Sequence, residues 1–373
     1  MIAENLEKPL ISILIVNFNG LRFLKTCFNS LRKCTYPNLE IIFIDNSSTD
    51  GSVDFVTKNY PEVKILKNKE NYMFARGNNE GIKIAAGKYF CLLNNDVEVD
   101  SGFIEPVIEM FEKHPEIGAC QSKLLEMQSR SHLEYTGACG GYIDWFGYTF
   151  LRGRIMDETE PDNGQYDESL PIFWASGACL FLRRKALESL ASRRGSELLD
   201  EDFKLHMEEI DLCWRLRLAG WVIYSIPQSM VWHYGGGTLG HDSPAKIYYN
   251  FRNNIFMLAK NLSTVNLIIR LPLRIILDVV AFVRSLIVFQ TSMAMAILKA
   301  YRWLLFHIGL IWKKRRGVQN QRRVPDREVL NLMYPGSIVF EFFLLGKKHF
   351  SDLLFSDKFI ARISQNKIAK NSH

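Results

Sequence analysis

Short apolar runs and amphipathic segments alternate along the first hundred residues. Four runs have the length and β-branched or aromatic content of strands, at residues 10–16, 40–44, 63–66 and 89–93, and we expect the first two to be buried. Between them, apolar residues recur at helical spacing in 21–31 and 74–86. This alternation predicts an α/β fold, with a mostly parallel, Rossmann-like sheet flanked by helices.

Polar side chains follow three of the predicted strands at the point where each strand ends. Asn17 follows the first strand, Asp45 the second and Asp96 the fourth. Ligands of open parallel sheets bind beyond the carboxyl ends of the strands, so we expect the three side chains to converge on one cleft. A carboxylate there suits a divalent cation that bridges a diphosphate, although Asp96 as a loop cap is the alternative.

The second half of this region carries two further candidates. Residues 120–172 mix glycines with aromatics, which predicts loops and short antiparallel strands. A helix predicted over 207–219 begins with Glu208, Glu209 and Asp211, directly before core-like residues. Packed carboxylates have raised pKa values, which suits a general base, whereas an acidic helix start that pairs with the helix dipole is the alternative.

His233 precedes three glycines, in the stretch VWHYGGGTLG. A histidine between aromatics is usually a core residue. Glycines let the backbone approach a ligand closely, and histidine is a common metal ligand. His233 is therefore a second candidate metal ligand.

Charge divides the chain into two parts. Residues 1–240 hold 25 Lys/Arg against 33 Asp/Glu, a net −8, whereas residues 241–373 hold 21 against 7, a net +14. We interpret 1–240 as the catalytic domain and 241–373 as a basic, apolar helical extension. The seven cysteines include no CxxC pair, and the first residues lack the pattern of a signal peptide, so we expect a cytoplasmic protein with reduced thiols.

The extension has the composition of a membrane-associated region. Residues 263–312 are apolar with interspersed cations, among them Arg270 and Arg274, and the longest charge-free stretch, 285–298, has 14 residues. A spanning helix needs about 20 apolar residues, so amphipathic helices lying in the membrane interface are favoured over a true span or a packed cap. The cations at 313–316 would meet anionic head groups.

Six stretches in order resemble the motif set of glycosyltransferase family 2, in its rhamnosyltransferase-like bacterial branch. They are ISILIVNFNG, IIFIDNSSTDGS, NYMFARGNNEGIKIAAGKYFCLLNNDVEVD, WASGACLFLRR, FKLHMEEIDLCWRLRLAGW and SMVWHYGGGTLG. KIYYNFRNNIFMLAKNL resembles the segment after the histidine motif in that branch. The resemblance covers about residues 10–262 and implies the A-type glycosyltransferase fold.

The resemblance also implies roles for individual residues. The nucleotide pocket would be formed by Val16, Asn17, Asn19, Asp45, Arg76 and Asn95. Asp96 matches the last acid of the metal-binding DxD motif, and His233 matches a residue that often completes the metal site with Mg²⁺ or Mn²⁺. Glu209 matches the acid that serves as general base, with Glu208 and Asp211 beside it. The first acid of DxD is replaced by Asn94, and the usual Glu-Asp pair is Glu-Glu.

These observations predict an inverting glycosyltransferase at the inner face of the cell membrane. Its donor would be a nucleotide sugar, dTDP-rhamnose-like or a UDP-sugar, and its acceptor a saccharide or lipid-linked glycan of the bacterial surface. The expected partners are donor, acceptor and an anionic membrane surface. A catalytically inactive nucleotide-sugar-binding protein is one alternative. A basic nucleic-acid-binding protein is the other, but the cations lie among long aliphatic residues, and we expect no nucleic acid as partner.

Overall fold

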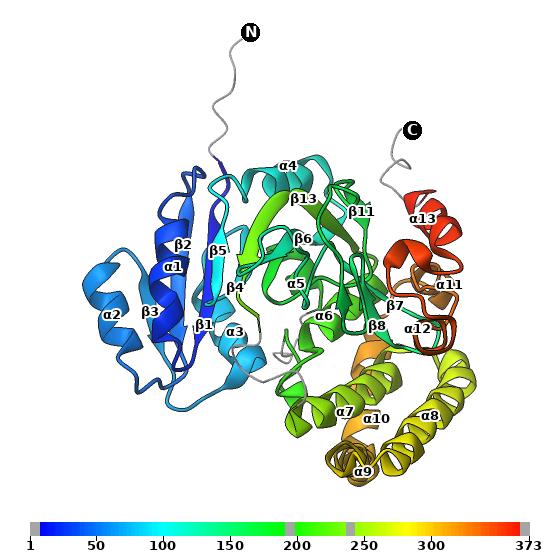
Figure 1. Cartoon of the computed structure of the whole chain (residues 1–373). Helices are drawn as coiled ribbons and strands as arrows, with labels where there is room; N and C mark the ends of the chain where they lie inside the picture. The colour runs from blue at the N-terminus through cyan, green and yellow to red at the C-terminus, as the bar shows by residue number, and fades with distance from the viewer. Residues whose placement is uncertain (1–7, 191–197, 236–242, 366–373) are drawn as a thin grey trace.

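The computed structural model describes residues 8–190, 198–235 and 243–365. Nine of the described strands form the central sheet: β1 (Ile11–Asn17), β2 (Leu39–Asp45), β3 (Lys64–Lys67), β4 (Tyr89–Asn94), β5 (Val97–Val99), β6 (Ile117–Glu126), β11 (Leu170–Pro171), β12 (Cys179–Arg183) and β13 (Val222–His233). Their order is β11-β13-β6-β12-β4-β1-β2-β3, and β5 pairs with β13 (Figure 1). The strands β4, β1, β2 and β3 are parallel, as the sequence predicts, and β12 is antiparallel to both its neighbours.

Helices cover both faces of this sheet: α1 (Leu21–Leu31), α2 (Ser52–Asn59), α3 (Met73–Ile84), α4 (Glu105–Lys113), α5 (Arg184–Leu190) and α6 (Glu208–Leu218). Side chains of a strand alternate between faces. Accordingly, Ile13 and Ile15 belong to the core beneath α1, α2 and α4, whereas Leu14 belongs to the core beneath α3, α5 and α6. The apolar runs of β1, β2 and β4 are therefore strands buried on both sides, whereas β3 lies at the edge of the sheet and exposes Lys64 and Lys67.

The glycine-rich region 120–172 adds a small antiparallel sheet beside the central one. It contains β7 (Gly141–Ile143), β8 (Thr149–Leu151), β9 (Arg154–Ile155) and β10 (Glu158–Thr159). Leu133, Tyr142 and Phe150 belong to the same core as α6. This region thus shares a hydrophobic core with α6.

The C-terminal region is helical and packs against the catalytic body. Its elements are α7 (Pro244–Asn261), α8 (Thr264–Ile287), α9 (Thr291–Phe306), α10 (Ile308–Gln321), α11 (Asp326–Leu330), α12 (Ile338–Leu345) and α13 (Ser356–Gln365) (Figure 1). Leu304, Tyr334 and Phe359 lie in one continuous core with Phe173 and Trp214. The division at residue 240 stays a prediction, and the core extends across it.

Two expectations about the basic residues of this region need correction. Arg270 and Arg274 are buried on the inner face of α8, where Arg274 donates to Asp278 at 3.0 Å and Arg270 donates to the carbonyl of Trp145 at 3.2 Å. These cations hold α8 on the body, because a buried charge needs a partner. They are not available to lipid head groups.

The four cations at 313–316 also have different environments, so they do not form one exposed cluster. Lys314 forms ion pairs with Asp200 and Asp202, both at 2.7 Å. Arg315 is buried and donates to two backbone carbonyls at the end of α7. Lys313 and Arg316 are exposed, so the predicted four-residue patch is wrong and two cations remain at the surface.

Within the described residues, no single helix has the length and apolar content needed to cross a membrane. Thr291–Phe306 and Ile308–Gln321 reach that length and composition only as a pair, and they are bent by 71° at the break between them.

Candidate active site

The polar residues at the strand ends meet at the carboxyl edge of the sheet. Asn17 lies opposite Asp45 in the register of β1 and β2, and Val16 lies opposite Asn94 in that of β1 and β4. Asn95 Nδ2 donates to Asn17 Oδ1 at 2.6 Å. The structure therefore brings together residues separated by almost 80 positions, as expected from the parallel topology.

The loop after β2 is fixed to the loop after β1 by side-chain hydrogen bonds. Asp45 accepts from the backbone N–H of Ser48 at 3.0 Å, and the Ser48 hydroxyl accepts from Asn17 Nδ2 at 3.0 Å and from the backbone of Asn19 at 2.9 Å. Asn19 has a left-handed backbone with φ of 50°. This network holds the amides and the Asp45 carboxylate at the mouth of the site, where hydrogen bonds to a base or ribose are possible.

Helix α3 lies against the same edge. Gly77 lets it approach β1, because a Cβ at this position would lie 3.0 Å from Val16 Cγ1. Arg76 stacks on Tyr72 at 3.5 Å and lies 3.9 Å from a carboxylate oxygen of Glu201. Its side chain is 42% exposed, so the guanidinium remains accessible to a phosphate group.

The two predicted metal ligands are in direct contact. His233 ends β13, and its Nε2 lies 3.1 Å from Asp96 Oδ1 and 3.1 Å from Asn94 Nδ2. On the other side of the ring, His233 Nδ1 lies 3.2 Å from Glu134 Oε1. Burial alone lowers the pKa of His233, but the charges of Glu134 and Asp96 raise the pKa to about 10. At neutral pH the His233 ring is therefore protonated and itself balances the charge of these carboxylates, and it would bind a metal ion only after losing the Nε2 proton.

Glu134 is a functional candidate that the sequence patterns did not reveal. It is buried, and its second carboxylate oxygen accepts from the backbone and hydroxyl of Thr136 at 2.7 and 2.6 Å. A carboxylate that orients the far nitrogen of a metal-binding histidine is a common supporting contact. A single glutamate in the irregular region 120–172 carries no pattern that would have identified it.

The side chains at this edge could hold a metal ion only together with a substrate. Within residues 8–190, 198–235 and 243–365, no group of three or more His, Cys, Asp or Glu side chains is placed to hold a metal ion. Mg²⁺-type ions in nucleotide sites use one or two carboxylates together with substrate phosphates. Asp96 and His233 fit that role, since Glu134 anchors Nδ1 and leaves Nε2 facing Asp96. Gly236 and Gly237, which also follow His233 in the motif, lie outside the described residues.

The three acids at the start of α6 have different environments. Glu208 is buried, its Oε2 has no hydrogen-bond partner among the described residues, and burial and the charge of Glu209 raise its pKa well above the ordinary value. Glu209 is only partly buried, and burial raises its pKa to about 7 although backbone hydrogen bonds lower it. A partly accessible carboxyl group with a pKa near neutrality suits proton transfer.

Asp211 has the environment of a structural residue. It is completely buried and accepts from Arg215 at 2.8 Å, Lys260 at 3.0 Å and Asn261 at 2.8 Å. With these partners its carboxylate joins α6 to α7. This placement favours a structural role over the predicted proton transfer.

A strained loop positions the acids. Lys204, His206 and Met207 have φ of 62°, 66° and 71°, a left-handed conformation that costs about 1–3 kcal/mol per non-glycine residue and is concentrated at functional sites. Asn253 Nδ2 on α7 donates to three carbonyls of this loop, at 2.7 to 3.1 Å, and Arg252 donates to the carbonyl of Phe203 at 2.6 Å. These contacts keep the loop in its strained form.

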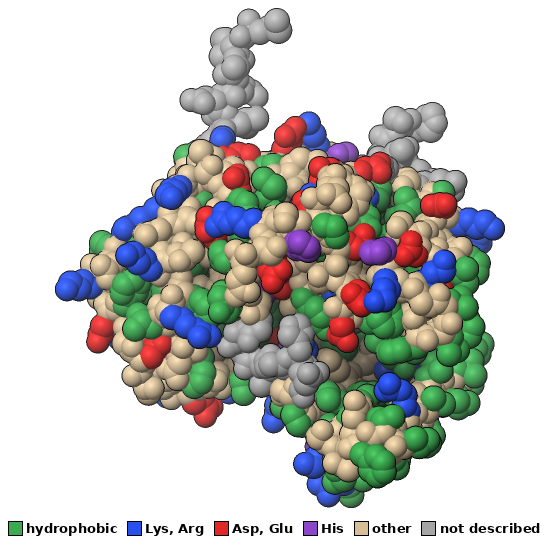
Figure 2. Space-filling model, viewed as in Figure 1, with side chains coloured by type: hydrophobic (Ala, Val, Ile, Leu, Met, Phe, Trp, Pro, Cys, Tyr) green, Lys and Arg blue, Asp and Glu red, His purple; other side chains and the backbone are tan. Residues whose placement is uncertain are grey.

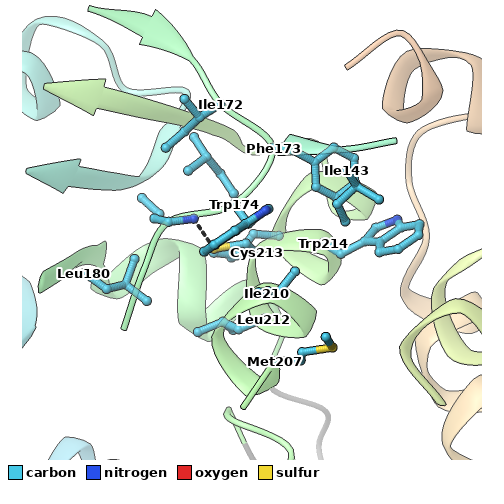
Figure 3. Packing of buried hydrophobic residues seen from close by; sticks show 14 of the residues in the cluster. Ile143, Ile172, Phe173, Trp174, Leu180, Met207, Ile210, Leu212, Cys213 and Trp214 are labelled. Atoms are coloured by element: carbon cyan, nitrogen blue, oxygen red, sulfur yellow. Dashed lines mark hydrogen bonds between the residues drawn. The ribbon is translucent and has the colours of Figure 1, made fainter. Parts of the chain in front are cut away.

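Packing fixes the rest of α6 (Figure 3). Ile210, Cys213 and Trp214 point into the core, and the backbone N–H of Ala175 donates to Cys213 Sγ at 3.4 Å. Three residues further on, the carbonyl of Ala178 accepts from the backbone N–H of Asn94 at 3.0 Å. Residues 175–178 therefore contact both α6 and the end of β4, and they link the helix that begins with the acids to the strand that precedes Asp96.

Known glycosyltransferases are similar to this chain in sequence. The family model described as glycosyl transferase family 2 matches residues 12–190. N-acetylglucosaminyl-diphospho-decaprenol L-rhamnosyltransferase of Mycobacterium tuberculosis is 24% identical over 245 residues, which cover 62% of this chain and 78% of the relative. Poly-beta-1,6-N-acetyl-D-glucosamine synthase of Staphylococcus epidermidis is 25% identical over 254 residues, covering 63% and 56%.

A similar fold occurs in a solved structure. The crystal structure of GalNAc-T7 with UDP, GalNAc and Mn²⁺ matches with a TM-score of 0.53 and 17% identity. The match covers 69% of this chain and 48% of that chain, so this chain spans about half of its length. At this identity the likeness concerns the fold.

Proposed function

We propose that this chain, a glycosyltransferase whose residues 12–190 match the model of glycosyltransferase family 2, moves a sugar, with inversion, from a nucleoside diphosphate donor to a saccharide or lipid-linked acceptor of bacterial surface glycan synthesis. A dTDP-rhamnose-like donor or a UDP-sugar is the expected substrate. The name of the mycobacterial relative supports both a rhamnosyl donor and a lipid-linked acceptor.

One observation carries this proposal: the site has two kinds of acid with different properties. Asp96 is paired with His233 at the sheet edge, where positive charge is attracted. Glu209 at the start of α6 has a pKa of about 7. Sugar transfer needs both, since charge develops on the leaving diphosphate while a proton leaves the attacking hydroxyl.

The residues of the candidate site would have separate roles in this reaction. Asn17 and Asp45 would bind the nucleoside, and Arg76 would contact phosphate. Asp96 and His233 would hold Mg²⁺ or Mn²⁺, which when bound neutralises charge on the diphosphate. Glu209 accepts the proton of the acceptor hydroxyl. The oxygen of that hydroxyl attacks the anomeric carbon from the side opposite the diphosphate. The bond from that carbon to the diphosphate oxygen breaks, and the configuration is inverted.

A donor screen tests the proposal. Purified full-length chain with Mn²⁺ is incubated with a panel of nucleotide sugars, and release of nucleoside diphosphate is measured. We expect turnover with one donor class, increased by a suitable saccharide acceptor. Tight donor binding without release under any condition would instead support an inactive nucleotide-sugar-binding protein.

The second part of the proposal is attachment to the inner face of the cell membrane. The outer face of α8 exposes a row of large apolar side chains: Val265, Ile268, Ile269, Leu273, Ile276, Val279, Val280, Val283, Leu286 and Ile287. Figure 2 shows hydrophobic side chains gathered where α8, α9 and α12 lie in Figure 1. An exposed apolar patch of this extent is typical of an interaction surface. Three of the four charged side chains of α8 are buried and only Arg284 is exposed, so the outer face of this helix suits the hydrocarbon boundary of a bilayer.

Vesicle flotation should detect this surface. Burying a large aliphatic side chain contributes about 1.5–3 kcal/mol. The double substitution Ile276→Glu and Val280→Glu, one turn apart on the exposed face, should therefore lower partitioning into anionic vesicles at least about tenfold. Nucleotide binding should not change.

Ile84→Glu provides the matched control, because Ile84 is 49% exposed on α3 at the catalytic body. Flotation of this variant should equal that of the unchanged chain. A full-length chain that stays at the bottom of the gradient would contradict membrane attachment.

A further inference from the structure

A second hollow lies between α7 and α9, away from the sheet edge. It is an open groove of about 960 Å³, within the size range of small-molecule sites. Its walls are formed by Pro244, Ala245, Tyr248, Tyr249, Ser292, Met295, Ala296, Lys299, Arg302, Trp303, Phe306 and His307. None of these residues belongs to the site described above.

The groove offers positive charge without an internal partner. Lys299 and Arg302 are exposed on α9, one turn apart, and neither forms an ion pair with any residue that the structure describes. Two neighbouring free cations beside aromatic rings form a site for a phosphate group. Elsewhere in the C-terminal region, the buried cations of α8 and α10 are already bound to carboxylates or carbonyls.

Exposed apolar side chains lie on both sides of the two cations along α9. Met295 comes one turn before Lys299 and Phe306 one turn after Arg302, and they are 51% and 79% exposed. A ligand in which a phosphate group is joined to a hydrocarbon chain would contact both the cations and the apolar side chains.

The inner wall connects the groove to the catalytic loop. The guanidinium of Arg252 lies 4.6 Å from the ring of Trp303 and 5.0 Å from that of Tyr249. The same group donates to the carbonyls of Asp202 at 2.8 Å and Phe203 at 2.6 Å, directly before the strained loop. The aromatic wall of the groove is thus connected through Arg252 to the loop that precedes α6.

We propose that this groove binds the phosphate group and the first hydrocarbon units of a lipid-linked acceptor. The choice of an acceptor as the occupant rests on the proposed function. It places Lys299 and Arg302 as acceptor-binding residues and commits to the acceptor lipid rather than bulk phospholipid as the occupant.

Binding of farnesyl diphosphate, a soluble isoprenoid diphosphate, tests the assignment on the full-length chain. Calorimetric titration should show binding, and Lys299→Gln with Arg302→Gln should weaken it at least about tenfold, because charge-assisted contacts are lost. Farnesol, which lacks the charge, and inorganic diphosphate, which lacks the chain, should bind more weakly than farnesyl diphosphate. Titration with nucleoside diphosphate should give the same affinity in both proteins.

Lys313→Gln with Arg316→Gln is the matched control, since it removes the same charge from exposed cations outside the groove. Equal weakening by both pairs would assign the effect to general electrostatics and overturn the proposal, as would unchanged binding after the groove substitutions. The titration needs no turnover. A donor screen without product would therefore contradict the proposed function alone. A titration without binding, together with turnover in the donor screen, would contradict the assignment of the groove alone.

Discussion

Glu209→Gln is expected to lower the rate of sugar transfer by at least about 10², the usual contribution of a general base. The amide keeps the size of the side chain and cannot accept the proton. Affinity for the donor should be retained, because the nucleotide contacts lie at the sheet edge. Steady-state kinetics with a soluble acceptor, together with a nucleotide titration, measures both quantities.

The pH profile gives an independent check of the same residue. Burial raises the pKa of Glu209 to about 7, so the carboxyl group is protonated and inactive as a base below that pH. The value of kcat/KM should therefore fall about tenfold for each pH unit below about 7 in the unchanged chain, and this acid limb should disappear in Glu209→Gln.

Two neighbouring variants identify which acid acts. Glu208→Gln should keep measurable transfer, because the Glu208 side chain is buried and less accessible to an acceptor than that of Glu209. Asp211→Asn should lower the melting temperature, since Asp211 joins α6 to Arg215 and Lys260. Near-normal turnover of Glu209→Gln, with loss in Glu208→Gln, would move the base to Glu208.

Asp96→Ala is expected to remove any gain in activity from added Mn²⁺ and to lower kcat/KM by about 10² or more, because charge stabilisation by a metal contributes several kcal/mol. Removing Asp96 also leaves Glu134 as the remaining charged partner of the His233 ring. Activity measured across a Mn²⁺ titration, with and without EDTA, gives the readout. Equal activity in excess EDTA and in Mn²⁺ would show that Asp96 is a loop cap.

Glu134→Gln should have a weaker effect on metal binding than Asp96→Ala. It keeps the side chain and its size but removes the charge that orients His233 Nδ1. Apparent Mn²⁺ affinity should fall about 10- to 100-fold, the usual effect of losing such a supporting contact, with activity recovered at high Mn²⁺. Asp96→Ala should not recover.

Much of the fold could be predicted from the sequence, because strand and helix patterns depend on residues that are close together in the chain. Apolar runs of four to seven residues predict buried strands, and their alternation with helical periodicity predicts the parallel part of the sheet. The same topology places Asn17, Asp45 and Asp96 at one edge, as the structure shows. The motifs around these positions resemble family 2, and residues 12–190 match its model.

Predictions that depend on which side of an element a charge faces could not be made from sequence. Arg274 and Lys314 look like surface cations in a basic region, yet the fold pairs them with Asp278 and Asp200. Lys314 and Asp200 are separated by 114 positions. The residue type does not show whether a charged side chain is solvated or paired in the core. Composition therefore predicted a basic surface where the structure has internal ion pairs.

The sequence by itself therefore determined the architecture and the polar strand ends, since periodicity and strand order are properties of neighbouring residues. Only the tertiary structure decided that Glu134 orients His233, that Asp211 is structural and that α8 turns its apolar face outward. Each of these depends on contacts between segments that are distant along the chain. Such contacts exist only once the core has brought the segments together, and in that dry interior a single charge must find a partner or change its pKa.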